Sequence, residues 1–404
     1  MSRKKRNNTD RNSNQKNKFV GTLEVSTRGV AIVICQGIED KILIENIGQY
    51  LHNDIVEIYV FTRKKKDKYL GEITSLIKRE KTEYVGKIQI SEKFSFVLID
   101  NKRIHVDVFV PIDKINNAKN NEKVIVEITE WRKNSQSPNG IIKKVLGVEG
   151  EHNTEIHSIL AEHGLPYDFE SEIKSFADNI DTSINKEEIL KRRDFRKELT
   201  FTIDPVDAKD FDDAISFKTI SEGCYEIGIH IADVSHYLKP KTILDVEAFK
   251  RGTSVYLVDR VVPMLPEVLS NKACSLRPHE EKLTFSAVFI IESNKVKNQW
   301  FGKTVINSDH RFSYEEAQEV IETKENIIKK EVSLNNKQYS VPNNVKTAIL
   351  KLNEIAEIMR VKRMESGAIS FDKKEVRFTI NKEKEPIGVY VKESKEANKL
   401  VEEF

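Results

Sequence analysis

Short runs of alternating hydrophobic and polar residues fill the chain from residue 19 to about residue 145. The runs are rich in valine and isoleucine, and polar turns separate them at regular intervals. A period of two places successive side chains on opposite faces of a strand, so the pattern predicts antiparallel sheets with one buried face. Because the strands are short and evenly spaced, we expect them to close into small barrels.

The same stretch divides into two similar halves. Each half begins with a strand that carries a glycine before an aliphatic residue, VGTLEV in the first half and VGKIQI in the second, and returns with a strand such as DIVEI or KVIVEI. Halves of roughly 60 residues with about five strands each are typical of Greek-key barrels of the OB type. We therefore predict one OB barrel at residues 19–80 and a second at residues 81–148.

OB barrels commonly bind single-stranded nucleic acid by stacking bases on aromatic side chains within a basic groove. The second half offers candidate aromatic and cationic residues for such a groove: Phe94, Phe96, Phe109, Lys93, Lys102, Arg103 and His105. The alternative interpretation places the three phenylalanines in the barrel core. The sequence leaves both interpretations open.

Beyond the barrels the hydrophobic period changes to that of a helix. Residues 149–199 include NTEIHSILAEHG and NKEEILKRRDFRKE, which predict a helical linker. From residue 200 onward, strands such as KLTFSAVFIIES mix with helices, and a long amphipathic helix is expected over residues 343–366. This mixture predicts an α+β domain over residues 200–404.

Composition and charge favour a soluble protein of several domains. The 404 residues are 39% hydrophobic and 32% charged, with a formal net charge of +2, and one compact core rarely holds so long a chain. Residues 1–18 carry seven Lys or Arg and one Asp. They predict a disordered basic arm, either a solvated tail or a polyanion-binding segment. The sequence has no apolar run long enough to span a membrane, so we expect no membrane association.

The chain contains three cysteines, Cys35, Cys224 and Cys274, which lie far apart and lack C-x-x-C spacing. This arrangement speaks against a zinc site or a disulfide framework. It favours a reducing compartment, and we expect a cytoplasmic protein. The simplest interpretation of each cysteine is a buried core thiol.

Carboxylates concentrate in TFTIDPVDAKDFDDAIS, residues 200–216. Five aspartates fall there between two strand-like runs: Asp204, Asp207, Asp210, Asp212 and Asp213. Pro205 sets a turn between the runs, so carboxylates from a strand end and its adjoining loop can converge. Like charges held close together repel one another unless a hard cation lies among them. Mg²⁺ prefers such oxygen ligands, and two such ions would stabilise both oxygens of a phosphoryl displacement.

The acidic loop has other interpretations. It lacks the glycine and the glutamate that an EF-hand requires at its sixth and twelfth positions, which excludes that motif. The strand-forming flanks make a fully solvated turn less favourable. The residues alone leave a catalytic Mg²⁺ site and a structural Ca²⁺ loop both open.

Four longer strings resemble successive signatures of the ribonuclease II/ribonuclease R (RNB) family. They are RRDFRKELTFTIDPVDAKDFDDAISF, IGIHIADVSHYL, RGTSVYLVDRVVPMLPEVLSNKACSL and SGAISFDKKE. The resemblance extends from about residue 20 to the last residue and implies that the two barrels are cold-shock domains. The basic arm and the strings HIADVSHY and GTSVYL are more similar to bacterial ribonuclease R than to ribonuclease II.

The resemblance implies an activity. Members of the family are processive, hydrolytic 3′-to-5′ exoribonucleases that use Mg²⁺ to degrade single-stranded RNA to nucleoside 5′-monophosphates. Their four acidic metal-site positions fall on Asp204, Asp210, Asp212 and Asp213, of which Asp210 and Asp212 are also expected to be catalytic. Asp207 lies outside these four and is expected to be a loop residue.

The resemblance also implies RNA-binding aromatic residues. Tyr256 in GTSVYL matches the tyrosine that packs against the 3′-terminal nucleotide, and Phe371 in GAISF matches the phenylalanine at the other end of the stacked nucleotides. His230 and His236 could be read as acid–base groups, but we interpret them as structural.

The chain ends in EANKLVEEF, which resembles the start of a helix in the middle of the family's catalytic domain. An arginine and a glutamate of the site, and an S1 domain, would follow in the family, so we expect a fragment or a truncated form. Two hypotheses follow: the first part of a monomeric exoribonuclease that acts on single-stranded or structured RNA, or an RNA-binding chain without catalytic activity.

Overall fold

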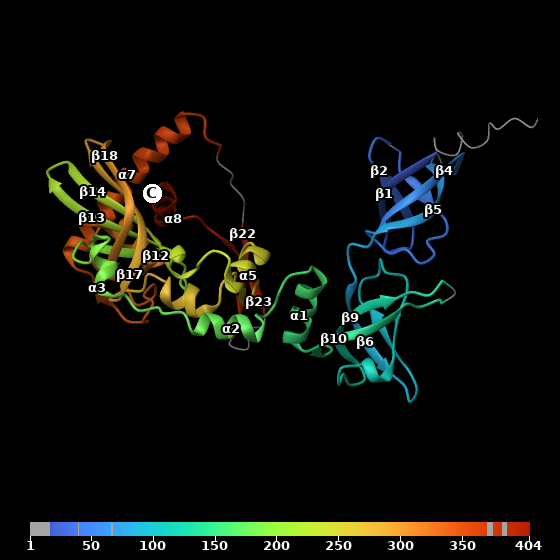
Figure 1. Ribbon diagram of the computed structural model, residues 1–404. Helices are drawn as coiled ribbons and strands as arrows, with labels where there is room; N and C mark the ends of the chain where they lie inside the picture. Colours follow the sequence, from blue (N-terminus) through green and yellow to red (C-terminus); the bar gives the residue numbers. More distant parts are fainter. Residues whose placement is uncertain (1–16, 39, 66–67, 134, 370–374, 382–385) are drawn as a thin grey trace, which may run out of the picture. The chain divides into compact units, whose positions relative to one another are not determined.

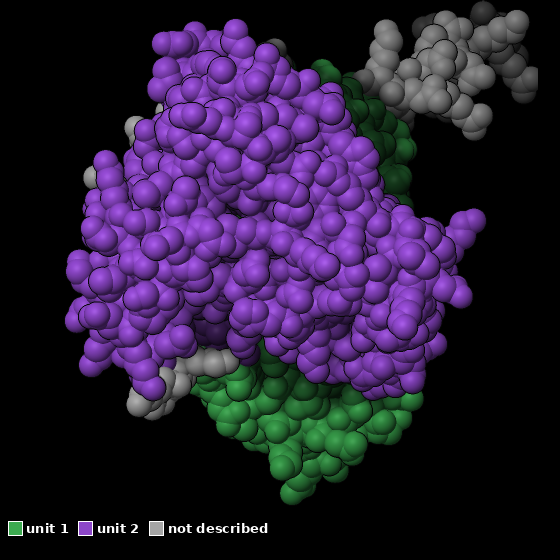
Figure 2. Space-filling model, turned by 90° about the vertical axis from the view of Figure 1, so that its left-hand side faces the viewer, with its two compact units in different colours: residues 1–167 green, residues 168–404 purple. Residues whose placement is uncertain are grey.

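The computed structural model describes residues 17–38, 40–65, 68–133, 135–369, 375–381 and 386–404. It divides the chain into two compact units, residues 1–167 and residues 168–404, which Figure 2 distinguishes by colour.

The first unit contains two closed five-stranded barrels (Figure 1). Their strands are β1 (Lys18–Val25), β2 (Ala31–Cys35), β3 (Ile42–Ile44), β4 (Ile55–Lys65) and β5 (Lys68–Lys78), then β6 (Glu83–Ile90), β7 (Ser95–Ile99), β8 (Val108–Val110), β9 (Glu122–Glu130) and β10 (Asn139–Val148). Going around each barrel, the strands follow the same order, β1-β2-β3-β5-β4 and β6-β7-β8-β10-β9. The repeated OB-type architecture predicted from the two similar halves is therefore confirmed.

The glycine shared by the first strand of each barrel has a steric reason. A Cβ atom on Gly21 would lie 2.4 Å from the carbonyl oxygen of Ile34, and one on Gly86 would lie 2.3 Å from that of Leu98. Each glycine therefore lets the neighbouring strand approach closely at this point of the barrel.

The two barrels and the first helix pack as one unit. Leu51, in the loop before β4, is fully buried in the core cluster of the second barrel. Helix α1 (His152–Glu162) is tied to the barrels because the Lys81 ammonium donates to the carbonyl oxygen of Glu162 at 2.6 Å. The predicted linker, residues 149–199, is therefore divided between the two units.

The second unit is built on a seven-stranded sheet in the order β11-β18-β17-β14-β13-β12-β19 (Figure 1). Its strands are β11 (Arg193–Asp194), β12 (Thr200–Asp204), β13 (Asp213–Ser221), β14 (Cys224–Ala232), β17 (Glu281–Glu292), β18 (Lys295–Asn307) and β19 (His310–Ser313). Most neighbours are antiparallel, but β12 pairs with β19, and β11 with β18, in parallel.

Helices cover both faces of this sheet. One core cluster joins Phe201, Ile215 and other sheet residues to α6 (Tyr314–Thr323), α7 (Asn343–Glu365) and α8 (Glu396–Glu403). A second cluster joins the opposite face to the remaining helices: α2 (Ser171–Asp178), α3 (Lys186–Leu190), α4 (Val234–Tyr237), α5 (Ile243–Arg251) and the π-helix η2 (Val268–Ala273). The α+β class and the long helix predicted over residues 343–366 are confirmed.

Short elements complete the described chain. They are the 3₁₀ turn η1 (Ile112–Lys114) and three strand pairs, β15 (Val255–Tyr256) with β16 (Val261–Val262), β20 (Ile327–Ile328) with β21 (Tyr339–Ser340), and β22 (Glu375–Ile380) with β23 (Pro386–Lys392).

The three cysteines are free and buried, as predicted. Within the described residues, no helix combines the length and apolar character needed to cross a membrane.

One helical prediction is wrong. The helical linker predicted up to residue 199 includes NKEEILKRRDFRKE, residues 185–198, but α3 ends at Leu190 and β11 follows at Arg193–Asp194. The amide of Phe195 donates to the carbonyl oxygen of Val305 at 2.8 Å, and the Phe195 ring is buried in the core. Pairing with β18 thus overrides a weak local helical preference.

Candidate functional site: an acidic loop and an aromatic barrel face

The acidic residues gather at one end of two neighbouring strands. Asp204 is the last residue of the buried strand β12, and Asp213 is the first residue of β13. These strands are antiparallel neighbours, with Phe201 opposite Ile215, so the chain leaves and re-enters the sheet at the same end. The acidic loop, residues 205–212, connects them. Strand pairing thus brings the two ends of the acidic segment, Asp204 and Asp213, to the same end of the sheet.

The carboxylates of this region are electrostatically strained. Burial, followed by the charges of Asp213 and Asp212, raises the pKa of Asp204 to about 7. The surrounding protein, together with Asp210 and Asp213, raises the pKa of Asp212 although its side chain reaches solvent, and burial raises the pKa of Asp213. Raised pKa values from several crowded carboxylates are typical of functional sites.

These residues suit a hard divalent cation in their chemistry. The four donors are all carboxylates, and in the described part of the chain Asp204 Oδ2 is buried without a hydrogen-bond partner, as expected of an atom that a cation would contact. Across the described ranges, no group of three or more His, Cys, Asp or Glu side chains is arranged so that it could hold a metal ion. The donor set is therefore present, but its side chains are not converged on a common point.

Tyr256 lies beside the acidic loop. It is the second residue of the short strand β15, and its hydroxyl donates to Asp210 Oδ2 at 3.5 Å. The Tyr256 side chain is 68% exposed, so its ring is accessible to a nucleotide base. Phe371, the other aromatic residue expected to contact RNA, lies outside the described residues. Asp207 is an exposed loop residue.

Two residues that the sequence patterns did not single out hold the acidic loop. The Ser275 hydroxyl donates to the carbonyl oxygen of Lys209 at 2.9 Å and accepts from the amide of Phe211 at 3.1 Å. On β19, Arg311 donates to carbonyl oxygens of the same loop. Backbone groups are present at every position, so no residue pattern marks which of them a side chain will bind.

The two candidate histidines differ in environment. His230 is fully buried, with Nδ1 2.7 Å from Ser286 Oγ and Nε2 2.9 Å from Ser216 Oγ, and burial lowers its pKa to about 3. His236 lies beside Arg192 and Glu188, at 3.4 Å and 3.6 Å. These surroundings agree with the structural interpretation of both histidines.

His230 should make the second unit less stable in acid. The unfolded chain binds a proton near pH 6.5, whereas the folded chain does so only near pH 3, so stability from this group is lost as the pH falls between these values. From pH 7 to pH 5 the free energy of unfolding should fall by about 2 kcal/mol more in the wild type than in His230→Gln. Urea unfolding followed by Trp300 fluorescence, in a Trp131→Phe background, measures this difference.

The control for this measurement is His279→Gln, since His279 is an exposed histidine of the same unit. Its pH dependence should equal that of the wild type. An equal pH dependence for the wild type and His230→Gln would contradict the buried neutral imidazole.

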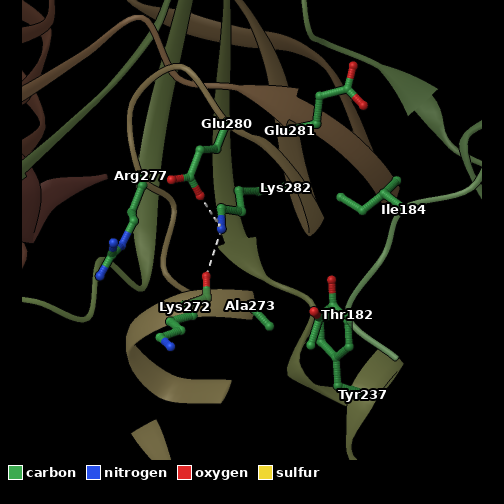
Figure 3. Close-up of a pocket in the computed structure, with 9 residues that line it drawn as sticks. All are labelled: Thr182, Ile184, Tyr237, Lys272, Ala273, Arg277, Glu280, Glu281 and Lys282. Carbon is green, nitrogen blue, oxygen red and sulfur yellow. Dashed lines mark hydrogen bonds and ion pairs between the residues drawn. The ribbon is translucent and has the colours of Figure 1, made fainter. Parts of the chain in front are cut away.

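A surface hollow near η2 is a weaker candidate for an anion site. Figure 3 shows Lys272, Arg277 and Lys282 along its wall. The Lys282 ammonium donates to the carbonyl oxygen of Lys272 at 2.7 Å and pairs with Glu280 at 2.8 Å, and the Arg277 guanidinium points away from the hollow. The Lys282 ammonium is therefore already engaged within the protein, which makes this hollow the weaker candidate.

The second barrel presents a surface of aromatic rings, which we call the aromatic face: Phe94, Phe96 and Phe109. The rings contact one another edge to face, with centroids 5.9 Å apart for Phe94 and Phe96 and 5.5 Å apart for Phe96 and Phe109. They alternate with buried Ser95 and Val110 and lie outside the barrel core. The core interpretation of these phenylalanines is therefore wrong, because strand alternation directs them outward.

Comparison with known proteins agrees with this arrangement of domains. The family model for the RNB domain matches residues 192–404, and the model for a cold shock domain matches residues 96–170. A solved structure of Mycoplasma genitalium RNase R in complex with ribose-methylated single-stranded RNA has the same fold, with a TM-score of 0.81 at 23% identity. That likeness covers 95% of this chain and 59% of the other.

Sequence relatives lead to the same family. Ribonuclease R from Thermotoga maritima is 35% identical over 391 residues, which cover 95% of this chain and 53% of the relative. DIS3-like exonuclease 2 from Xenopus tropicalis is 39% identical over 289 residues, which cover 70% of this chain and 34% of the relative. The chain thus spans about half the length, or less, of these relatives. Since the RNB domain model matches more than half of its residues, the chain belongs to the RNB family.

Proposed function

We propose that this chain acts in processive, hydrolytic 3′-to-5′ degradation of single-stranded RNA to nucleoside 5′-monophosphates, with Mg²⁺ as cofactor. The observation that carries the proposal is the position of Asp204 and Asp213 at the paired ends of β12 and β13, with Asp210 and Asp212 in the loop between them and the Tyr256 hydroxyl 3.5 Å from Asp210 Oδ2. The name of the Thermotoga relative and the RNA bound to the Mycoplasma structure support RNA as the substrate.

Asp204, Asp210 and Asp213 would hold the Mg²⁺ ion, and Asp212 would either contribute to a second ion or orient the attacking water. The bound ion would supply charge neutralisation and a more acidic water at the scissile phosphate. Asp212 is the exposed member of the four, so it can approach the substrate. Desolvation by the surrounding protein, together with the charges of Asp210 and Asp213, raises its pKa, which makes it a stronger proton acceptor than an ordinary aspartate.

Aromatic side chains would bind the RNA without regard to sequence. Tyr256 would stack on the 3′-terminal base beside the carboxylates, and the aromatic face would hold bases on the second barrel. Stacking on an aromatic ring contributes about 1–3 kcal/mol per base and is sequence-tolerant, since every base offers a π-face. Such binding suits an enzyme that degrades RNA one nucleotide after another, and we propose that it does so as a monomer.

The second candidate function is RNA binding without hydrolysis. The observation that favours it is the lack of a converged metal-binding group among the residues that the structure describes. In that case the barrels would bind RNA, and the carboxylates would take no part in catalysis.

The test is to incubate the 404-residue chain with single-stranded RNA labelled at its 3′ end, with Mg²⁺ or with EDTA, and to measure binding in parallel. We expect labelled mononucleotide with Mg²⁺ and none with EDTA. A second arm joins the chain to the C-terminal half of Thermotoga ribonuclease R, since the match covers 53% of that relative.

Hydrolysis in either arm supports the exoribonuclease. RNA that is bound but stays full length in both arms supports the binding-only function and contradicts the catalytic one. Absence of both binding and hydrolysis contradicts both proposals.

A further inference from the structure

We propose that Arg311 is a positioning residue that holds the backbone of the acidic loop, and through it the spacing of the carboxylates, without itself contacting the substrate. The part of this proposal that concerns metal binding rests on the proposed function. The part that concerns the loop backbone stands independently.

The position of Arg311 in the sheet brings its side chain close to the acidic loop. It lies on β19, which pairs in parallel with β12, so that Arg311 is opposite Thr202 and two residues before the strand end at Asp204. From there its side chain reaches the loop that leaves β12. Its Nη2 atom lies 3.0 Å from the carbonyl oxygens of Pro205 and Val206 and 3.4 Å from that of Ala208.

The guanidinium also contacts the far end of the loop. Its central carbon lies 4.6 Å from the centroid of the Phe211 ring, a distance at which a cation is attracted to an aromatic face. One planar group therefore joins Pro205, the first residue of the loop, to Phe211 near its end. A planar fork with fixed donor directions can impose such a geometry, and a flexible ammonium group is a poor replacement.

The same contacts argue against a catalytic role for Arg311. Nη2 carries two N–H groups and already faces three carbonyl oxygens. Within the described residues, Nε is buried without a hydrogen-bond partner, so it too is turned away from solvent. The N–H groups of Nη2 and Nε are thus directed to the loop and to the protein interior, whereas an arginine that stabilises a phosphate presents such groups to it.

Ser275 holds the loop from the other side. It is fully buried and bonds both the carbonyl oxygen of Lys209 and the amide of Phe211, and the amide of Leu276 donates to the carbonyl oxygen of Phe211 at 2.8 Å. The loop is thus fixed between β19 and the segment after η2. Because repulsion between carboxylates favours spreading, these contacts oppose an expansion of the site.

Hydrogen exchange on the whole chain tests the proposal. In Arg311→Lys, which keeps the charge, amides of residues 206–213 should exchange at least about tenfold faster, while peptides from α7 and from the barrels are unchanged. Arg251→Lys is the matched control, because Arg251 likewise bonds two backbone carbonyls, of Pro263 and Asp168, and stacks on an aromatic ring. It should leave exchange of residues 206–213 unaltered.

A second readout is calorimetric titration with Mn²⁺, which takes the same oxygen ligands as Mg²⁺. Arg311→Lys should weaken Mn²⁺ binding at least about tenfold, and Ser275→Ala should reproduce both effects through the other side of the loop. Unchanged exchange of the acidic loop in Arg311→Lys would overturn the proposal. Faster exchange with undiminished Mn²⁺ affinity would overturn the part that concerns the spacing of the carboxylates. If the wild type binds no Mn²⁺ but the loop still exchanges faster in Arg311→Lys, the loop contact is supported and the proposed metal function is contradicted.

Discussion

Asp212→Asn should lower the rate of mononucleotide release from single-stranded RNA at least about a hundredfold, the usual range for removing a group that assists proton transfer. Asp212 is the exposed carboxylate of the four, and its pKa is raised by the protein around it and by Asp210 and Asp213. The amide side chain has nearly the same shape but cannot carry a proton or bind a cation strongly. The measurement is single-turnover release of 3′-labelled nucleotide, in whichever arm of the assay is active.

Asp207→Asn provides a control in the same loop. Asp207 is exposed and lies outside the four proposed ligands, so the same chemical change there should leave the rate within about twofold of the wild type. RNA affinity should be retained in both variants, because the proposed stacking residues are untouched. Equal losses of activity in the two variants would indicate that loop charge, and not the Asp212 carboxylate, matters for the reaction.

Local pattern was sufficient to predict the barrels. Alternation with period two determines which residues face inward, and the two halves repeat that pattern around Gly21 and Gly86, where the neighbouring strand passes too close for a side chain. The same rule would have placed Phe94 and Phe96 outside the core, because buried Ser95 lies between them. The sequence alone left that choice open because a three-phenylalanine cluster is equally plausible as core.

Contacts between segments that are distant in the sequence could not be predicted from the local pattern. Strand β11 follows a helix-like pattern but pairs with β18, more than a hundred residues later. Arg311 and Ser275 hold the acidic loop through backbone carbonyls and an amide. Such backbone groups occur at every residue, so the sequence does not show which of them a side chain binds. The partners of β11 and Arg311 are set by the order of strands in the sheet, and that of Ser275 by the packing of the segment after η2; both are properties of the whole domain.

The candidate site could be predicted from the sequence in part. Residue type and spacing predicted a crowded carboxylate segment between two strands, and strand pairing places Asp204 and Asp213 at the same sheet end. The metal and catalytic roles of the four carboxylates stay predictions. Spacing could not predict that Asp204 would be buried with one oxygen unpartnered within the described chain, nor that Tyr256 would lie beside Asp210. The assignment of Tyr256 came from the family resemblance and remains a prediction.

Arg192→Leu should have the largest effect on stability, lowering the free energy of unfolding of the second unit by about 3–5 kcal/mol, because it leaves a buried carboxylate without its main partner. The Arg192 side chain is 0% exposed and that of Asp233 is 3% exposed, with Nη2 2.7 Å from Oδ2. Nη1 lies 3.2 Å from the carbonyl oxygen of Thr284. This arginine thus ties the start of β11 to the residue that follows β14 and to β17.

Urea unfolding followed by Trp300 fluorescence in the Trp131→Phe background measures the effect. Arg196→Leu is the control: its partners Asp194 and Glu281 are exposed, and such pairs contribute about 1 kcal/mol or less. The double variant Arg192→Leu/Asp233→Leu should be more stable than Arg192→Leu alone, since it removes the buried charge that the single variant leaves unpaired. A double variant less stable than the single one would mean that the loss arises from packing and backbone contacts of Arg192, and that the ion pair is not what stabilises this end of the sheet.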